Sequence, residues 1–511
     1  MSVSANNKRI AKNTIMLYCR MAVTMGISIF STRVLLQALG VSDYGLVNVI
    51  GGVVTMFGFI SGTMNTATSR YITFELGKNN FTRLKQIFNL SQLIFVGLIF
   101  ILFLLSETVG LWFFQTHLVL PPERADAAFW FFQFAVASFL LGIANTPYAA
   151  LVIAHENMKA FAWVSIFEAF ARLGIIYVLY LSSFDHLIFY GALLTLVSLV
   201  HFAIYFTICR VSYRESRFAY YFEKSLFKSL LSFGGWNLWG AISGLFTNVF
   251  VNVLLNNYFG SIANAARGVA SQVASAATSF TANFLTAVNP QITKYYAADK
   301  REQSYLLTMR ASRFGFFLMY FIALPAWILC PFVLDLWLES VPAHTVWFVR
   351  LILIQLLIDS LSYPLMTIAQ ASGRIALYQS IVGGMLWVNL PFTWLAFYFG
   401  APPESFGFVA ISISIVCLFL RLVLVRRCSG LPFWRFVYRV LVPVTLVAVV
   451  AAIVPAILNF FLFENPGVLQ FFVIAFACVF SSVPAILFLG IFKEERASIF
   501  NLLKTKIPLL K

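Results

Sequence analysis

Charged residues are scarce in this sequence, and acidic residues are the scarcer kind. Among 511 residues, 35 are Lys or Arg and 19 are Asp or Glu, so that 11% are charged while 61% are hydrophobic. A soluble domain has about 25% charged residues. The shortage excludes a soluble enzyme, and the abundance of hydrophobic residues excludes a disordered chain. The mean hydropathy of +0.87 predicts a polytopic membrane protein.

Motifs for catalysis and metal binding are also missing. The sequence has no GxxxxGK[ST] phosphate-binding loop, no HExxH and no paired CxxC. The longest predicted outer loop, near 115–126, is too short to hold a catalytic domain. We therefore expect a protein that is not an enzyme but moves its substrate, with no cofactor beyond a coupling ion, either H+ or Na+. The six cysteines, which lack the spacing of metal ligands, are Cys19, Cys209, Cys330, Cys417, Cys428 and Cys478.

Long, continuous hydrophobic runs dominate what is present. A helix needs about 20 apolar residues to cross the hydrocarbon core of a bilayer. The alternating pattern of an outer-membrane β-barrel is absent from the sequence. The predicted fold class is therefore an all-α polytopic membrane protein with about 14 transmembrane helices. They are expected near 14–39, 43–69, 87–114, 127–153, 158–181, 186–210, 229–256, 261–289, 309–336, 343–371, 374–400, 404–425, 437–463 and 467–492.

The distribution of Lys and Arg predicts the orientation of these helices. With the N-terminus placed inside, nearly all loop Lys and Arg residues lie in inner segments, and the outer loops hold only Arg124. Cytoplasmic loops carry such an excess of basic residues. Both termini are therefore expected in the cytoplasm. The net charge of +16 then reflects contact with an anionic leaflet and not nucleic-acid binding.

The longest inner linker divides the chain. Its aromatic and basic residues recur at roughly helical spacing, which predicts a basic amphipathic helix on the inner leaflet. Six helices precede it, so a second six-helix lobe could follow as a parallel repeat. A shift of 220 residues, from Gly40 to Gly260, supports the repeat, although identity over this shift is low and chance is an alternative. The predicted divisions are an N-terminal lobe at 1–210, a cytoplasmic connector at 211–228, a C-terminal lobe at 229–427, two additional helices at 428–492 and a cytoplasmic tail at 493–511.

Ionisable residues inside the predicted spans are the candidate functional residues, because each costs about 2.5–3.5 kcal/mol to insert. Arginines outnumber acids among them. A surplus of Arg predicts a cavity for anions, since a guanidinium group binds phosphate oxygens through parallel hydrogen bonds. The candidate substrate-binding residues are Arg20, Arg33, Arg172, Arg267 and Arg350, and the candidates for ion coupling or ion pairing are Glu168, Asp359 and His201.

Two pairs among these residues also have a purely structural interpretation. Glu168 and Arg172 are four residues apart on one helix and can neutralise each other. Arg350 could pair with Asp359, although nine residues do not place two side chains on the same face of a helix. Either pairing would remove an arginine from the substrate site.

Three further residues have alternatives of their own. Arg20 and Arg421 lie within about two turns of the inner face, so their guanidinium groups could reach the headgroups. His201 lies near the middle of its span, where it is either a hydrogen-bonded packing residue or part of a proton relay.

Four segments resemble the polysaccharide transporter and Wzx-type oligosaccharide flippase family. They are KRIAKNTIMLYCRM at 8–21, STRVLLQALGVSDYGLVNVIGG at 31–52, NTATSRYITFELGK at 65–78 and VNPQITKYYAAD at 288–299. The resemblance therefore covers about the first 310 residues. This family lies in the multidrug/oligosaccharidyl-lipid/polysaccharide (MOP) exporter superfamily, together with multidrug and toxin extruders and lipid II flippases.

The resemblance implies two six-helix lobes around a central cavity, plus two extra C-terminal helices. Alternating access would move an undecaprenyl-pyrophosphate-linked oligosaccharide from the cytoplasmic to the outer leaflet of the bacterial inner membrane. The expected partners are this lipid-linked substrate, membrane lipids and polysaccharide polymerases, with the transporter itself a monomer. Family members use cationic residues on the first and eighth helices near the pyrophosphate, and Arg20, Arg33 and Arg267 lie in those helices here.

Two other functions compete with this one. A cation-coupled multidrug extruder of the same superfamily would need unpaired acids in its cavity, for which Asp359 and Glu168 are the main candidates. A membrane-embedded polysaccharide polymerase or ligase would need a sizeable outer loop with catalytic Arg or His. The outer side is expected to hold only Arg124 and a few histidines, which are His117, His186 and His344.

Overall fold

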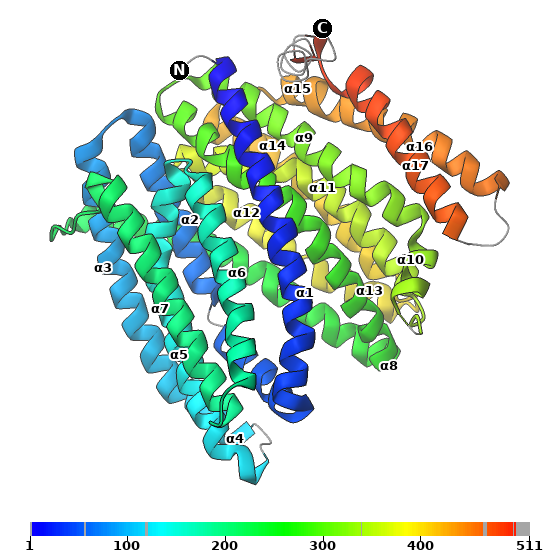
Figure 1. Ribbon diagram of the computed structural model, residues 1–511. Coiled ribbons are helices and arrows are strands. Elements are labelled where there is room, and N and C mark those ends of the chain that lie inside the picture. The colour runs from blue at the N-terminus through cyan, green and yellow to red at the C-terminus, as the bar shows by residue number, and fades with distance from the viewer. Residues whose placement is uncertain are drawn as a thin grey trace, which may run out of the picture. The chain divides into compact units, whose positions relative to one another are not determined.

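The computed structural model describes residues 3–55, 58–117, 121–338, 340–462, 468–493 and 495–496, and these residues form helices joined by short turns. Within those ranges no strand occurs, so the predicted all-α fold class is confirmed. Figure 1 shows the helices and their labels. The α-helices are α1 (Val3–Thr55), α2 (Gly58–Lys78), α3 (Phe81–Leu105), α4 (Leu111–His117), α5 (Ala125–Ala154), α6 (Met158–Tyr180), α7 (His186–Ser212), α8 (Lys224–Ala297), α9 (Arg301–Ile328), α10 (Cys330–Trp337), α11 (Thr345–Ser372), α12 (Ala376–Trp387), α13 (Asn389–Tyr398), α14 (Ser405–Ser429), α15 (Phe433–Phe436), α16 (Val442–Leu462) and α17 (Val468–Ala485).

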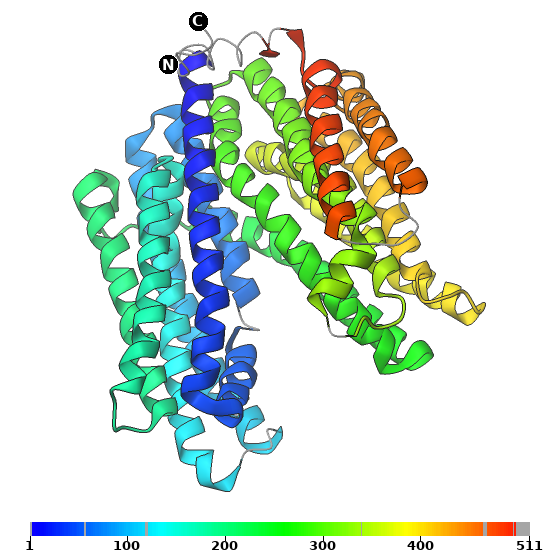
Figure 2. The same ribbon diagram turned by 45° about the vertical axis from the view of Figure 1, so that its right-hand side comes forward.

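Two of these helices are too long to cross a bilayer once. At 1.5 Å per residue, a straight helix of the 74 residues of α8 would reach about 110 Å, several times the hydrocarbon thickness. Both α1 and α8 are interrupted by one glycine with non-helical angles, Gly40 (φ 75°, ψ 170°) and Gly260 (φ 75°, ψ −171°). Figure 2 shows α1 turning back at its lower end.

The count of spans approaches the predicted number once these breaks are included. Among the described residues, 12 helices are long and apolar enough to span a membrane, with α8 counted once. Residues Arg267 and Asn252, on either side of Gly260, form a hydrogen bond, so α8 folds back and supplies two spans. The predicted span near 43–69 is not among these 12, so a total of fourteen stays a prediction.

The same backbone conformations recur 220 residues apart. Gly40 and Gly260 share a φ of 75°, and Asn79 and Asp299 share left-handed φ angles of 56° and 57°. The turn after α2 donates from Asn80 N to the Glu75 carbonyl at 3.1 Å, and the turn after α8 repeats this bond from Lys300 to Tyr295 at 3.0 Å. Sequence identity is low over this shift, but the turn geometry supports an internal repeat.

The contacts divide the chain into two compact units. Unit 1 comprises Met1–Ala241 and Thr286–Lys300, and unit 2 comprises Ile242–Leu285 and Arg301–Lys511. These limits differ from the predicted lobes because both ends of α8 pack in unit 1. A Cβ atom placed on Gly77 of α2 would lie 2.7 Å from the carbonyl oxygen of Lys294, so helices α2 and α8 approach closely there.

The connector between α7 and α8 differs from its prediction. Residues 213–223 form a 3-10 turn, η3 (Arg214–Ser216), followed by a non-helical segment, so the predicted amphipathic helix is wrong there. Side-chain hydrogen bonds hold the segment against α3: Asn89 Oδ1 accepts from the Ala219 N–H at 2.8 Å, and Arg83 pairs with Glu223 at 2.5 Å. These bonds replace the backbone bonds of a helix.

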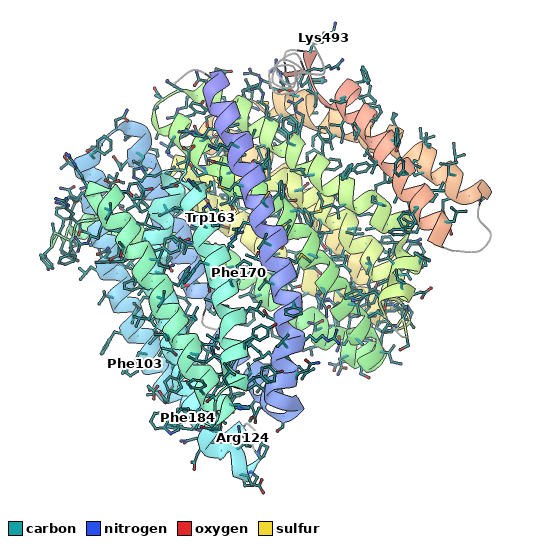
Figure 3. The ribbon with its side chains drawn as sticks, viewed as in Figure 1. Phe103, Arg124, Trp163, Phe170, Phe184 and Lys493 are labelled. Carbon is teal, nitrogen blue, oxygen red and sulfur yellow. The ribbon has the colours of Figure 1, made fainter. Side chains whose placement is uncertain are left out.

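At the opposite end of unit 1, Arg124 joins its own segment by ion pairs to two others that are distant in sequence. Arg124 forms ion pairs with Asp43, beyond the Gly40 turn, and with Asp185 at 2.5 Å. Asp185 also caps α7, accepting from Leu187 N at 3.0 Å. Burial opposes its ionisation, yet the hydrogen bonds from Arg124 and from the α7 backbone lower the pKa of Asp185. Figure 3 shows Arg124 at this end, with exposed Phe184 beside it.

The two helices beyond the second lobe, α16 and α17, pack against each other and against α9 within unit 2. Tyr320 of α9 donates its hydroxyl to the Ala448 carbonyl at 2.6 Å. The buried Arg313 of α9 pairs with Glu495 at 2.7 Å, which ties the end of this hairpin to the lobe. Most of the predicted tail at 493–511 lies outside the described residues.

We predict that Gly40→Ala and Gly260→Ala each destabilise the protein by about 1–3 kcal/mol, because their angles belong to a region open almost only to glycine. No atom lies within 4 Å of a Cβ at either position, so crowding does not contribute. Thermal unfolding of the purified protein in detergent measures the effect. Gly26→Ala and Gly268→Ala, in helical backbone with equally open surroundings, are the matched controls and should be neutral. Equal Tm values for all four variants would contradict the prediction.

Candidate functional site

Six polar residues of unit 1 meet where helices α1, α6 and α7 pack together. On α6, Ser165, Glu168 and Arg172 have the i, i+3, i+7 spacing that places side chains on one helix face. His201 and Tyr205 are one turn apart on α7 and face this stripe. Arg20 completes the set from α1. We call these six residues the N-terminal polar cluster.

An ion pair lies at the centre of this cluster. Glu168 Oε1 accepts from Arg172 Nε at 3.1 Å and from Arg172 Nη2 at 2.9 Å, so the predicted i, i+4 pair is present. Glu168 Oε2 lies 3.4 Å from His201 Nε2. His201 packs edge-on against Tyr205, with ring centroids 5.1 Å apart. A histidine that touches a carboxylate could exchange a proton with it, so this contact keeps the relay interpretation of His201 open.

Arg20 is held by α6 and does not reach toward the headgroups. Its Nη1 donates to Ser165 Oγ at 3.3 Å, and its guanidinium lies 4.9 Å from the centre of the Phe161 ring. Electrostatic coupling to Tyr205 links it to the rest of the cluster. Arg33 is not part of this cluster. It is exposed on α1 and forms no ion pair with any residue that the structure describes.

In unit 2, Arg267 is surrounded by neutral groups. The fold at Gly260 brings it against the preceding arm of α8, where Nη1 donates to Asn252 Oδ1 at 2.7 Å and Nη2 donates to Asn248 Oδ1 at 3.1 Å. The Phe406 ring lies 5.2 Å from the guanidinium carbon. No carboxylate neutralises Arg267 within the described part of the chain. Its bonds to Asn248 and Asn252 use three of its five N–H donors, which leaves two for another acceptor.

Arg350 does not pair with Asp359, so that alternative is wrong. Its Nε donates to the Trp327 carbonyl at 3.1 Å, and its guanidinium lies over the Trp327 and Trp347 rings at 4.8 and 5.6 Å. Nine residues along α11 place Arg350 and Asp359 on different faces. Arg350 therefore remains a cation with neutral neighbours.

Asp359 instead faces Arg421 across the packed helices α11 and α14. Arg421 also interacts with the fully buried Tyr378 of α12. Arg421 thus interacts with Asp359 and Tyr378 within unit 2, and its reach to the headgroups stays a prediction. No ion pair joins Asp359 to Arg421 among the described residues, so the two charges attract each other without direct contact.

Glu168 thus forms an ion pair with Arg172, and Asp359 is attracted by Arg421, whereas Arg267 and Arg350 have no acidic partner among the described residues. Such an arrangement favours a negatively charged ligand, because each guanidinium in an apolar setting gains most from an anion. The described residues contain no group of His, Cys, Asp and Glu that could hold a metal ion. Glu168 and His201 supply a contact between a carboxylate and an imidazole, and Arg267 and Arg350 supply guanidinium groups with neutral neighbours.

The sequence alone did not point to Glu156, which follows α5. Its side chain is 1% exposed and lies 2.9 Å from Arg9 Nη2 and 2.6 Å from Lys294 Nζ. Gln291 Nε2 donates to the same carboxylate at 2.6 Å. Glu156 also has a φ of 60°, a costly angle for a residue with a Cβ. The nearby signal was VNPQITKYYAAD, which contains both Gln291 and Lys294, but no pattern connects it with position 156.

This ionic cluster joins the start of α1, the α5–α6 turn and the end of α8, all within unit 1. Asn13 Nδ2 also donates to the Glu156 carbonyl at 3.3 Å. Because the single carboxylate of Glu156 contacts two cations at once, it joins three segments that are far apart in sequence.

The architecture resembles transporters of known structure. No known protein family and no curated protein sequence matches the chain. A multidrug resistance MATE family transporter of the MOP superfamily, in an outward-facing conformation, superposes with a TM-score of 0.72 at 13% identity, covering 83% of this chain and 96% of that one. A MATE protein in its bent conformation gives a TM-score of 0.74 at 12% identity, with the same coverage.

A third similar structure is a MOP superfamily transporter from Pyrococcus furiosus, described as having a binding pocket of reverse polarity that suggests a different function. Its TM-score is 0.71 at 13% identity, with 83% of this chain and 96% of that one covered. At such identities the likeness shows the fold. The chain therefore has the fold of MATE transporters of the MOP superfamily, and these neighbours are transporters rather than enzymes.

We predict that Glu156→Gln lowers the stability of the purified protein by about 3–5 kcal/mol, because Arg9 and Lys294 then lack their counterion. Glu156→Gly also removes the carboxylate but relieves about 1–2 kcal/mol of backbone strain. It should therefore be less destabilised than Glu156→Gln, and still less stable than the native chain. Thermal unfolding in detergent measures all three. A Gly variant as stable as the native protein would show that the carboxylate has no structural role.

Proposed function

We propose that this protein is a flippase that moves a lipid-linked oligosaccharide carrying a pyrophosphate from the cytoplasmic to the outer leaflet of a bacterial inner membrane. The single observation that carries this proposal is that Arg267 and Arg350 have neutral surroundings, while Glu168 is paired with Arg172 and Asp359 is attracted by Arg421. The MOP transporter fold and the resemblance of the first 310 or so residues to the Wzx-type family support it.

The chemistry of a pyrophosphate suits these arginines. It carries several acceptor oxygens, and Arg267 has two N–H donors left after its bonds to Asn248 and Asn252. Those asparagines orient the guanidinium, so less entropy is lost when a ligand binds. Arg20 and Arg172 of unit 1 are further candidate ligands, with Arg172 shared with Glu168.

Glu168 and His201 are the candidates for coupling transport to a proton, because their side chains touch. In this proposal the protein works as a monomer with cytoplasmic termini, and polysaccharide polymerases receive its product. Na+ is the alternative coupling ion.

A cation-coupled multidrug extruder is the second candidate, and the fold favours it, since similar structures include a multidrug resistance MATE transporter. Cationic drugs would need an acid that is free of arginine. The ion pair of Glu168 with Arg172 and the attraction of Asp359 by Arg421 are the reason to rank this function second. The pocket of reverse polarity described for the P. furiosus protein indicates that this fold also accommodates a different charge pattern.

The outer-side residues that a polymerase or ligase would need for catalysis already have other partners. Arg124, the only basic residue of the predicted outer loops, is already paired with Asp43 and Asp185. His344 contacts Glu404 at 2.6 Å, and His186 contacts the Ala38 carbonyl at 3.2 Å. Each of these side chains has a structural partner.

Transport in proteoliposomes tests the proposal. A fluorescent lipid-pyrophosphate oligosaccharide is placed in one leaflet, and its arrival in the other is followed by loss of protection from a membrane-impermeant reagent. We predict that Arg267→Gln and Arg350→Gln each slow flipping about tenfold or more, the loss expected for one charged hydrogen bond. Arg427→Gln, exposed at the end of α14, is the matched control and should flip normally.

No flipping by the native protein would refute the flippase. Normal flipping by both arginine variants would spare the function and refute the arginine site. For the extruder, drug resistance on overexpression that is lost in Asp359→Asn and kept in Arg267→Gln would be the decisive result.

A further inference from the structure

An open pocket of about 1040 Å³ lies in unit 1, away from the residues considered so far. It is formed by the start of α3, the end of α5 at His155, the end of α7 and the connector from Ser212 to Tyr221. In Figure 1 the connector is the green coil at the left edge, next to α3 and α7. By the predicted orientation this is the cytoplasmic end of the unit.

Hydrogen bonds fix both ends of the connector and so preform the pocket. At one end, Ser216 donates its hydroxyl to the Cys209 carbonyl at 2.8 Å, and the His155 ring stacks on Tyr213 at 4.1 Å. In the middle, the buried Asn89 accepts from the Ala219 N–H. A site built this way loses little entropy on binding.

The acids around the pocket already have hydrogen-bond partners. Glu215 contacts His155 Nε2 at 2.5 Å, and although burial opposes its ionisation, this hydrogen bond helps to lower the pKa of Glu215. Glu223 is bound by Arg83 and Tyr221, and the bond from Arg83 is the main cause that lowers the pKa of Glu223. Both carboxylates are therefore charged and occupied.

The cations of the pocket have no such partners. Lys85, Arg214 and Arg217 line it, and none of them forms an ion pair within the described ranges. Their charges converge from α3 and from both sides of η3. Tyr220 adds a hydroxyl group to the lining that can donate to an anion, whereas the Tyr221 hydroxyl already donates to Glu223.

The rim of the pocket is aromatic. Phe81 and Tyr220 line the pocket and are 58% and 76% exposed, and Phe218, next to the lining residue Arg217 in sequence, is 58% exposed. Aromatic side chains favour the boundary between hydrocarbon and headgroups, so the rim indicates that this pocket opens at the level of lipid headgroups. Basic pockets of this kind at the cytoplasmic face of membrane proteins hold phosphate headgroups.

We propose that Lys85, Arg214 and Arg217 form a binding site for the phosphate headgroup of an anionic membrane lipid. The lipid phosphate lies among the three cations, and its acyl chains extend along the exposed aromatic side chains. The site does not depend on the transported substrate, because it uses none of the residues of the proposed substrate site.

Native mass spectrometry of the full-length protein in detergent tests this proposal. The protein is titrated with phosphatidylglycerol, phosphatidylcholine, palmitate or inorganic phosphate. We expect preferential binding of phosphatidylglycerol, with a Kd raised about tenfold in the Arg214→Gln, Arg217→Gln double variant, since each basic residue near a lipid surface attracts it appreciably. Lys85→Gln, on a different element, should weaken binding as well.

The matched control is the Lys224→Gln, Lys228→Gln double variant, which removes the same charge from the same region but outside the pocket lining. It should bind phosphatidylglycerol as the native protein does. If phosphatidylglycerol binding weakened equally in both double variants, the lipid would be attracted by the basic surface in general and not held in the pocket, which would overturn the proposal. Palmitate binding as tightly as phosphatidylglycerol would overturn the phosphate assignment, and binding of inorganic phosphate without phosphatidylglycerol would overturn the assignment to a lipid. A flipping assay on the same variants keeps this result separate from the proposed function.

Discussion

The cost of an ion without a counterion in an apolar medium governs the arrangement of this protein. With 35 basic residues and 19 acidic ones, carboxylates cannot neutralise every cation. The structure assigns its acids to positions where segments distant in sequence must be joined: Glu156 binds Arg9 and Lys294, Glu495 binds Arg313, and Asp359 lies opposite Arg421. Arg267 and Arg350 receive amides, carbonyls and aromatic rings instead, and the same shortage leaves the connector pocket positive.

Hydrophobic runs were sufficient to predict the all-α class and most spans, because a membrane-crossing helix must satisfy its backbone internally. The breaks near Gly40 and Gly260 followed from gaps in hydrophobicity, and the Glu168–Arg172 pair followed from helical periodicity. Pairings between helices were not predictable. Asp359 and Arg421 are 62 residues apart, and no local pattern indicates which faces of α11 and α14 meet. The prediction of a helix in the connector was wrong for a related reason, because the conformation of this segment depends on Asn89 and Arg83 of α3.

Fold and charge pattern carry different information here. Similar transporters share the architecture at 12–13% identity, so the helical scaffold tolerates nearly complete replacement of its side chains. Substrate choice must therefore lie in a few positions, as is general for folds that host several functions. We propose that in this chain those positions include the arginines that lack acidic partners, Arg267 and Arg350. Their neutral surroundings distinguish the proposed anionic cargo from a cationic drug more clearly than the fold does.

The turn after α5 and the turn after α11 each need one residue in the left-handed region. The second has Gly373 with a φ of 77°, which any glycine adopts freely, and the first has Glu156 with a φ of 60°. At Gly373 the bend is an inherent property of the glycine. At Glu156 it is held by ionic contacts to Arg9 and Lys294, so one turn of the chain depends on residues distant in sequence whereas the other depends only on its own backbone.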